Sequence, residues 1–173
     1  MRRTRQPRPP KPPEDPHRAA LDQALRLISI RARTHQELRQ AFRRKELPED
    51  AQDAAIERLV SWGYLDDARF ARDRARALLR EGRLGSRAVV DRLRRHGLSL
   101  SEAQEATALA EVELEVDPLE AARSILERRG LLGAADMKTR ARAFRLLQSR
   151  GFSGETARQA LRLAALDPDG ADE

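Results

Sequence analysis

Three segments of this chain share one pattern, and this internal repeat constrains the fold more than any other feature. The segments begin at Leu38, Val89 and Ala143 and align without gaps, at offsets of 51 and then 54 residues. The matched large apolar positions are Phe42, Leu93 and Leu147, then Leu47, Leu98 and Phe152. Small residues match at Ala55, Ala106 and Ala160, and residues able to carry positive charge at Lys45, His96 and Arg150. Such a period predicts supersecondary units that stack along the chain.

Each repeat unit is predicted to hold three helices. In the first unit, apolar residues at helical spacing mark one helix after residue 18, Thr34 to Glu37 fits a capping box, and Pro48 and Gly63 bracket the third helix. The second unit predicts helices near 66–81, 86–96 and 100–113, the last opened by a capping box at Ser99 and Glu102. The third unit, opened by Asp117 and Pro118, predicts helices near 118–129, 137–150 and 154–165.

The composition agrees with an all-helical fold. Aromatic residues make up 3 % of the chain against 40 % for all apolar residues, so the interior is built mostly of Leu, Ala, Ile and Val. No stretch alternates as a half-buried strand does. We therefore expect an all-α fold of three tandem three-helix modules, residues 18–64, 65–115 and 116–166, in an elongated, curved array.

The two ends differ from this core. Residues 1–17 are rich in Pro and basic side chains and are expected to form a disordered arm, and residues 167–173 an acidic tail. The chain has no Cys, which excludes disulfides and thiolate chemistry, and no apolar run long enough to span a bilayer. These features predict a soluble, cytoplasmic protein without membrane contacts, expected to be a monomer.

Positive charge follows the repeat. The net charge is +6, and residues 31–45, 83–96 and 136–150, which include the three middle helices, carry local charges of +5, +4 and +4. A solvated helix face explains any single charge run, but three aligned basic helices in a repeat array can form one binding surface for an acidic protein or DNA. The candidate contact residues are Arg33, Arg39, Arg43, Arg44, Lys45, Arg87, Arg94 and Arg95, with Arg140, Arg142 and Arg145 as weaker candidates.

The segment WGYLDDARFA, residues 62–71, could form either a catalytic site or a structural junction between two helices. Adjacent carboxylates can serve catalysis, but Asp66 stands at the N-cap of a predicted helix and Asp67 in its first turn. We interpret the segment as a structural junction, in which Gly63 ends one helix and the side chains of Tyr64, Leu65 and Phe70, together with Trp62, pack into the core.

Other sequence signals for catalysis, metal binding or phosphate binding are weak. The three histidines, His17, His35 and His96, are dispersed along the chain, and the glycines Gly82 and Gly85 lack the Lys-Ser/Thr ending of a phosphate-binding loop. No catalytic, metal or cofactor site is therefore predicted.

The pattern resembles the bacterial RecX regulatory proteins. GYLDDARFA at the first junction, Arg33 to Leu38 (RTHQEL), and residues 85–98 (GSRAVVDRLRRHGL) are similar to motifs of that family. The resemblance covers roughly residues 20–165 and is looser in the third module. It implies a non-enzymatic protein that binds RecA, occupies the groove of its nucleoprotein filament and suppresses ATPase and strand exchange, and so acts in recombination and DNA repair.

Two other functions remain open on the sequence. The basic middle helices could bind single- or double-stranded DNA directly, or the array could be a scaffold for some other acidic partner. RecA and its DNA filament are the expected partners. Titration of DNA with and without RecA distinguishes a regulator of RecA from a protein that binds DNA directly.

Overall fold

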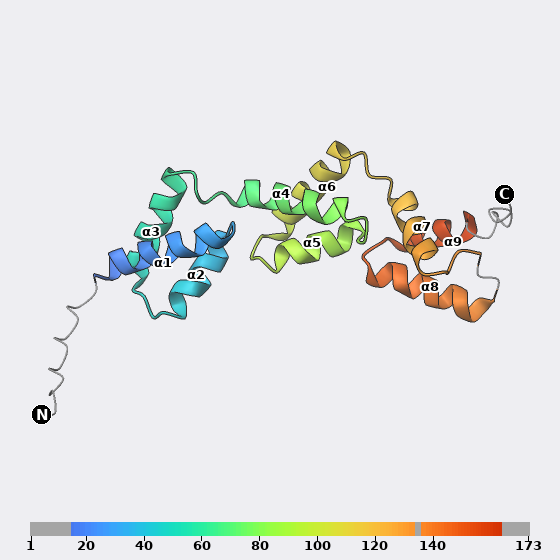
Figure 1. The fold of residues 1–173 in the computed structure, drawn as a ribbon, viewed down its shortest axis with the longest axis horizontal. Helices are drawn as coiled ribbons and strands as arrows, with labels where there is room; N and C mark the ends of the chain where they lie inside the picture. The colour runs from blue at the N-terminus through green and yellow to red at the C-terminus, as the bar shows by residue number, and fades with distance from the viewer. Residues whose placement is uncertain (1–14, 134–135, 164–173) are drawn as a thin grey trace, which may run out of the picture. The chain divides into compact units, whose positions relative to one another are not determined.

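The chain folds into helices joined by short loops. A computed structural model describes residues 15–133 and 136–163, and these hold nine helices and no strand (Figure 1). The helices are α1 (Pro16–Ile30), α2 (His35–Arg43), α3 (Glu49–Ser61), α4 (Asp67–Arg80), α5 (Ser86–Arg94), α6 (Leu100–Glu113), α7 (Pro118–Arg128), α8 (Met137–Ser149) and α9 (Gly154–Leu163). The predicted acidic tail and residues 1–14 of the predicted arm lie outside the described residues.

Local capping explains where several helices begin. The side chains of Thr34, Asp66 and Asp117 accept backbone N–H groups in the first turns of α2, α4 and α7. The predicted capping box at Ser99 and Glu102 is confirmed, with both reciprocal hydrogen bonds present. Helix α1 begins at Pro16, earlier than the sequence predicts.

The early start of α1 has a plain cause. Asp15 accepts the His17 N–H at 3.0 Å, and Pro16 occupies the first helical position, where its missing N–H removes no hydrogen bond. The sequence does not predict this cap, because the Pro-rich composition extends as far as Pro16.

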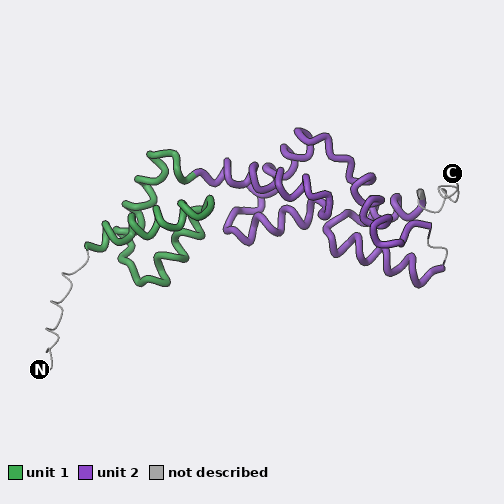
Figure 2. Tube along the Cα trace, in the orientation of Figure 1, with its two compact units in different colours: residues 1–65 green, residues 66–173 purple. Residues whose placement is uncertain are grey.

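The chain divides into two compact units, residues 1–65 and 66–173 (Figure 2). The first unit holds one hydrophobic cluster, built from α1, α2, α3 and Leu65. The second unit holds two, one from α4 to α6 and one from α7 to α9. The all-helical tandem fold is therefore confirmed, while the predicted module boundaries stay predictions.

Matched repeat positions form part of each of these clusters. Phe42, Leu93 and Leu147 are each 0 % exposed, and each belongs to a different cluster. The matched small residues Ala55, Ala106 and Ala160 are also buried, as close helix approach requires. We call the three helix groups the first (α1–α3), second (α4–α6) and third (α7–α9) modules.

Within the second unit, the second and third modules meet through backbone. Gly85 N–H donates to the Arg150 carbonyl at 2.8 Å, and Arg87 N–H donates to the Gly151 carbonyl at 3.2 Å. A Cβ on Gly85 would lie 2.6 Å from the Gly151 carbonyl oxygen, so no side chain fits between the two loops. The Arg128 guanidinium adds a hydrogen bond of 2.9 Å to the Gly82 carbonyl.

The junction segment corrects one part of the sequence reading. Trp62 is 49 % exposed and Tyr64 is 58 % exposed, so the prediction that both pack into the core is wrong. Gly63 has φ +72, and the N–H groups of Tyr64 and Leu65 both donate to the Leu59 carbonyl. This tight turn buries Leu65, at 2 % exposure, and leaves the Tyr64 side chain at the surface, where it contacts Trp62 edge to face.

The other junction residues serve α4. Asp66 accepts the Arg69 N–H at 2.9 Å, and Asp67 is the acidic residue of the first turn. Phe70 is partly buried against the cluster of the second module and its ring contacts His96 edge to face, with ring centres 5.2 Å apart. In the described part of the chain, none of the helices is long and apolar enough to cross a membrane.

Candidate partner-binding surface

The end of α2 presents a cluster of exposed positive charge. Arg43 is the last residue of the helix, Arg44 is its C-cap, and Lys45 follows in the turn. All three side chains are exposed, and within residues 15–133 and 136–163 no ion pair neutralises them. Basic side chains at this position also interact favourably with the helix dipole, which accounts for part of their presence.

The side chains of the other two candidates in the first unit are less exposed to solvent. Arg39 forms an ion pair of 2.8 Å with Asp53 of α3, so its charge is already partnered inside the module. Arg33 lies in the loop before α2 and is half-buried, and its Nε is enclosed without a hydrogen-bond partner among the described atoms. Both side chains are therefore less available to a partner than Arg43, Arg44 and Lys45.

Near the start of α2, one positive charge is paired with a carboxylate. The Arg31 guanidinium donates to both carboxylate oxygens of Glu37, at 2.8 and 2.9 Å. The hydrogen bond to Glu37 raises the pKa of Arg31 above its usual value. The pair is neutral as a whole, so the +5 of residues 31–45 lies on the other five basic residues, three of which stand together at the other end of the helix.

The second module repeats the arrangement of the first. Arg94 is the last residue of α5 and Arg95 its C-cap, and both side chains are exposed. At the repeat offset of 51 residues they match Arg43 and Arg44. Arg87 is also exposed but lies at the opposite end of α5, where its backbone contacts Gly151.

The third module departs from this pattern. Gln148 and Ser149 occupy the positions that match Arg94 and Arg95, so the end of α8 lacks the paired charges. Its candidates lie earlier on the helix, where Arg140 is half-buried and Arg142 and Arg145 are exposed.

Arg142 and Arg145 line a groove of about 470 Å³ with a residue that sequence reasoning missed. Arg129, the C-cap of α7, lies across the groove from α8, and Leu131, Leu146 and Ser149 complete the lining. Arg129 was not predicted because its neighbours in sequence belong to a different helix, and only the packing of α7 with α8 brings the three guanidinium groups to one groove. The available signal is its position at a helix end before Gly130.

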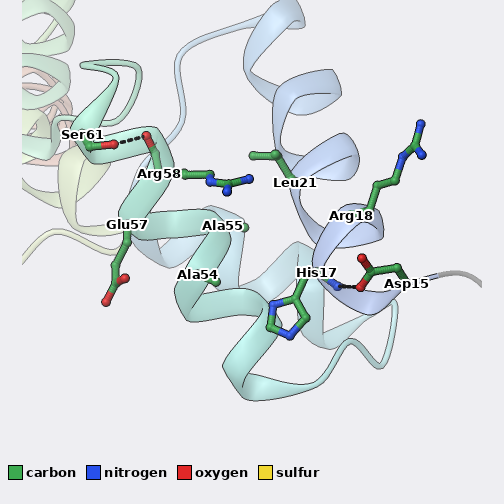
Figure 3. Close-up of a pocket in the computed structure, with 9 residues that line it drawn as sticks. All are labelled: Asp15, His17, Arg18, Leu21, Ala54, Ala55, Glu57, Arg58 and Ser61. Atoms are coloured by element: carbon green, nitrogen blue, oxygen red, sulfur yellow. Dashed lines mark hydrogen bonds between the residues drawn. The ribbon is translucent and has the colours of Figure 1, made fainter.

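A hollow of about 700 Å³ lies in the first unit between α1 and α3 (Figure 3). Leu21 and Ala55 contribute its apolar wall, and Arg58 extends its guanidinium toward Leu21. The one imidazole at its edge, His17, lies 3.3 Å from Asp50 in an exposed pair. This open groove brings together no nucleophile with an oriented base, which is the arrangement that covalent catalysis requires.

The three histidines have separate settings. His17 is near Asp50, His35 starts α2, and His96 packs on Phe70. In the part of the chain that the structure describes, no group of three or more His, Asp or Glu side chains is arranged to hold a metal ion.

Comparison with known proteins gives a consistent result. Residues 20–59 match the model of the RecX first three-helix domain, and residues 115–161 match that of the RecX third three-helix domain. The regulatory protein RecX of Syntrophotalea carbinolica is 36 % identical over 141 residues, covering 80 % of this chain and 91 % of the relative. The regulatory protein RecX of Stenotrophomonas maltophilia R551-3 is 35 % identical over 150 residues, covering 86 % and 87 %. The crystal structure of RecX from Lactobacillus salivarius aligns with a TM-score of 0.76 at 19 % identity, covering 88 % of this chain and 98 % of that one.

Proposed function

Because this chain belongs to the RecX family of regulatory proteins, we propose that it is a non-enzymatic regulator that binds RecA. In this proposal it occupies the groove of the RecA–DNA filament and inhibits ATP hydrolysis and strand exchange. The family membership supports a regulatory role, and the resemblance described above suggests RecA as the target. No catalytic residue is needed, since binding across neighbouring RecA protomers hinders the rearrangements that accompany ATP turnover.

The observation that carries the proposal is the matched pair of arginines at the ends of two middle helices. Arg43 and Arg44 end α2, and Arg94 and Arg95 end α5, at equivalent repeat positions, all exposed. A repeated filament presents the same acidic or phosphate-bearing surface at regular intervals, so a repeated basic feature can contact it more than once. Two weak contacts made by one chain bind more tightly than either alone.

The contact is expected to be largely electrostatic. Exposed guanidinium groups at an interface rim mainly raise the association rate and make binding sensitive to salt. Arg39 is excluded from this set because Asp53 already partners it. Arg142 and Arg145 are secondary candidates, because the third module lacks the paired arginines at the helix end.

The test is RecA ATPase activity on single-stranded DNA with increasing amounts of the protein. Charge reversal of the four matched arginines (R43E/R44E/R94E/R95E) is expected to raise the half-inhibitory concentration by about tenfold or more, because four attractive contacts become repulsive. A matched control reverses four exposed arginines on α1 and α4 (R26E/R72E/R74E/R80E), which leaves the net charge change identical.

Circular dichroism of both variants establishes that they are folded. Equal inhibition by the wild type and the folded matched-arginine variant contradicts the proposed surface. Tight, salt-sensitive binding to bare DNA with no effect on RecA ATPase contradicts the proposed function and favours direct DNA binding instead.

A further inference from the structure

Four arginines surround one small cavity where the second and third modules meet. The cavity has a volume of about 220 Å³ and is lined by Ile125 and by the side chains of Arg83, Arg128, Arg129 and Arg150. It lies wholly within the second unit, beside the backbone contact of Gly85 with Arg150. None of these four arginines was selected from the sequence as a contact residue.

The convergence results from the ends of three helices. Arg83 follows α4 in the loop to α5, Arg128 and Arg129 end α7, and Arg150 is the C-cap of α8. Arg83, Arg129 and Arg150 each adjoin a glycine that has a positive φ, and Arg128 adjoins Arg129. These turns bring three chain segments, distant in sequence, to the same point.

The helix dipoles do not cancel this charge. Basic residues commonly occupy helix C-termini, where the dipole is equivalent to about −0.5 elementary charge per helix. Three such ends contribute roughly −1.5, which is less than half of the four positive charges at the cavity. Glu81 and Glu127 are near in sequence, but neither lines the cavity.

The arginines have no carboxylate partner in the described ranges 15–133 and 136–163. Arg128 donates one hydrogen bond, to the Gly82 carbonyl at 2.9 Å, which orients its guanidinium without neutralising it. Like charges gathered at one cavity repel each other, and a bound anion relieves that repulsion. Guanidinium groups offer forked pairs of N–H donors that match the oxygens of a phosphate group.

We propose that this cavity is a phosphate-binding site and that a nucleic-acid strand supplies the phosphate. The argument for a strand is that Arg129 lines both this cavity and the groove of Arg142 and Arg145. The two basic hollows are thus neighbours, and a polymer with regularly spaced phosphates can fill both. The proposal goes beyond the regulation of RecA and does not depend on it.

The test measures binding of the full chain to fluorescent single-stranded DNA over a range of salt concentrations, without RecA. The variant R83Q/R129Q removes two of the four charges and retains Arg128 and its structural hydrogen bond. We expect its affinity to fall by about tenfold or more, since hydrogen bonds to charged groups are strong. The slope of log K against log salt should become shallower by about 0.7 for each phosphate that the variant no longer neutralises.

The control variant R72Q/R74Q removes the same charge from the exposed surface of α4 in the same unit. Equal affinity and slope for the two variants, both folded by circular dichroism, overturn the proposal. Binding to poly-L-glutamate distinguishes an acidic protein from a phosphate. If R83Q/R129Q weakens binding to poly-L-glutamate as much as binding to DNA, relative to the control, the site is not selective for phosphate and the proposal fails.

The source of the phosphate is tested by NMR of the arginine side chains. DNA is expected to shift the Nε–Hε signals of Arg83 and Arg129 more strongly than inorganic phosphate does at the same phosphate concentration. Equal shifts with inorganic phosphate assign the cavity to a free anion and overturn the assignment to a strand. Because RecA is absent from these assays, their failure leaves the RecA proposal standing, and the reverse also holds.

Discussion

Glu46, after the end of α2, holds a backbone conformation that glycine holds in the other two modules. Its φ is +54, and the residues that match it in the repeat are Gly97 and Gly151, with φ +90 and +87. This region strains a residue with a Cβ by about 1–2 kcal/mol, while glycine costs roughly 0.5–1 kcal/mol in extra chain entropy. The strain is the larger cost, so glycine is favoured at this position.

We therefore expect Glu46→Gly to raise the free energy of unfolding by up to about 1 kcal/mol. Urea unfolding followed by circular dichroism measures it. Glu57→Gly is the control, because Glu57 is exposed in the interior of α3, and glycine there should lower stability by about 1 kcal/mol. A decrease in both variants contradicts the argument from backbone strain.

At the scale of one element, α8 depends on the charge of its N-cap. Asp136 accepts the Thr139 N–H at 2.9 Å. Hydrogen bonding to Thr139 lowers the pKa of Asp136 below its usual value. A carboxyl whose folded pKa is lowered adds stability above its unfolded pKa of about 3.9, and that contribution is lost as pH falls through the folded pKa.

An NMR pH titration of the Asp136 carboxyl and the Thr139 amide tests this dependence. Both signals are expected to move together with a midpoint below about 3.9. In Asp136→Asn the amide should stay capped, because Asn is also a good N-cap, but its signal should no longer follow that titration. An Asp136 midpoint at or above the unfolded value contradicts the account.

Local signals in the sequence predicted the helices well because caps and turns are local. Ser99 with Glu102, and Asp117 with Pro118, mark helix starts through neighbours that are a few residues away. The sequence did not predict the side-chain directions at the first junction. The backbone N–H groups of Tyr64 and Leu65 both donate to the Leu59 carbonyl, and this turn decides which of the two side chains is buried.

The candidate surface was predictable only in part. The charges on α2 and α5 follow from the sequence because consecutive residues of one helix carry them. The meeting of Arg83, Arg129 and Arg150 does not, because it requires three separate segments to pack together. The presence of an arginine beside a glycine at each of these turns is a signal that becomes readable once the packing is known.

At the scale of the whole molecule, the contact between the second and third modules depends on the absence of two side chains. Gly85 has ordinary φ but no room, Gly130 has φ +60 with open space, and Gly151 has φ +87 and a Cβ position 2.3 Å from Ala88 N. Alanine at these three sites therefore separates the cost of steric overlap from the cost of backbone strain.

We expect Gly130→Ala to lower the free energy of unfolding by up to about 1 kcal/mol, because the backbone strain is partly offset by the chain entropy that glycine costs. Gly85→Ala should lower it by about 1–3 kcal/mol through overlap alone, and Gly151→Ala should lower it the most because it combines both. Thermal unfolding of the full chain ranks the three variants. If Gly151→Ala is no worse than Gly130→Ala, the two modules do not need the close backbone approach.

The same contact has a kinetic consequence. First-turn amides of a helix have no partner within the helix, and Arg87, in the first turn of α5, finds its partner in the third module at the Gly151 carbonyl. The Gly85 amide, just before that helix, is likewise held by Arg150. Such amides normally exchange with deuterium within moments, but here exchange must wait until the third module detaches. Their exchange rates therefore time how often the two modules come apart in the native protein.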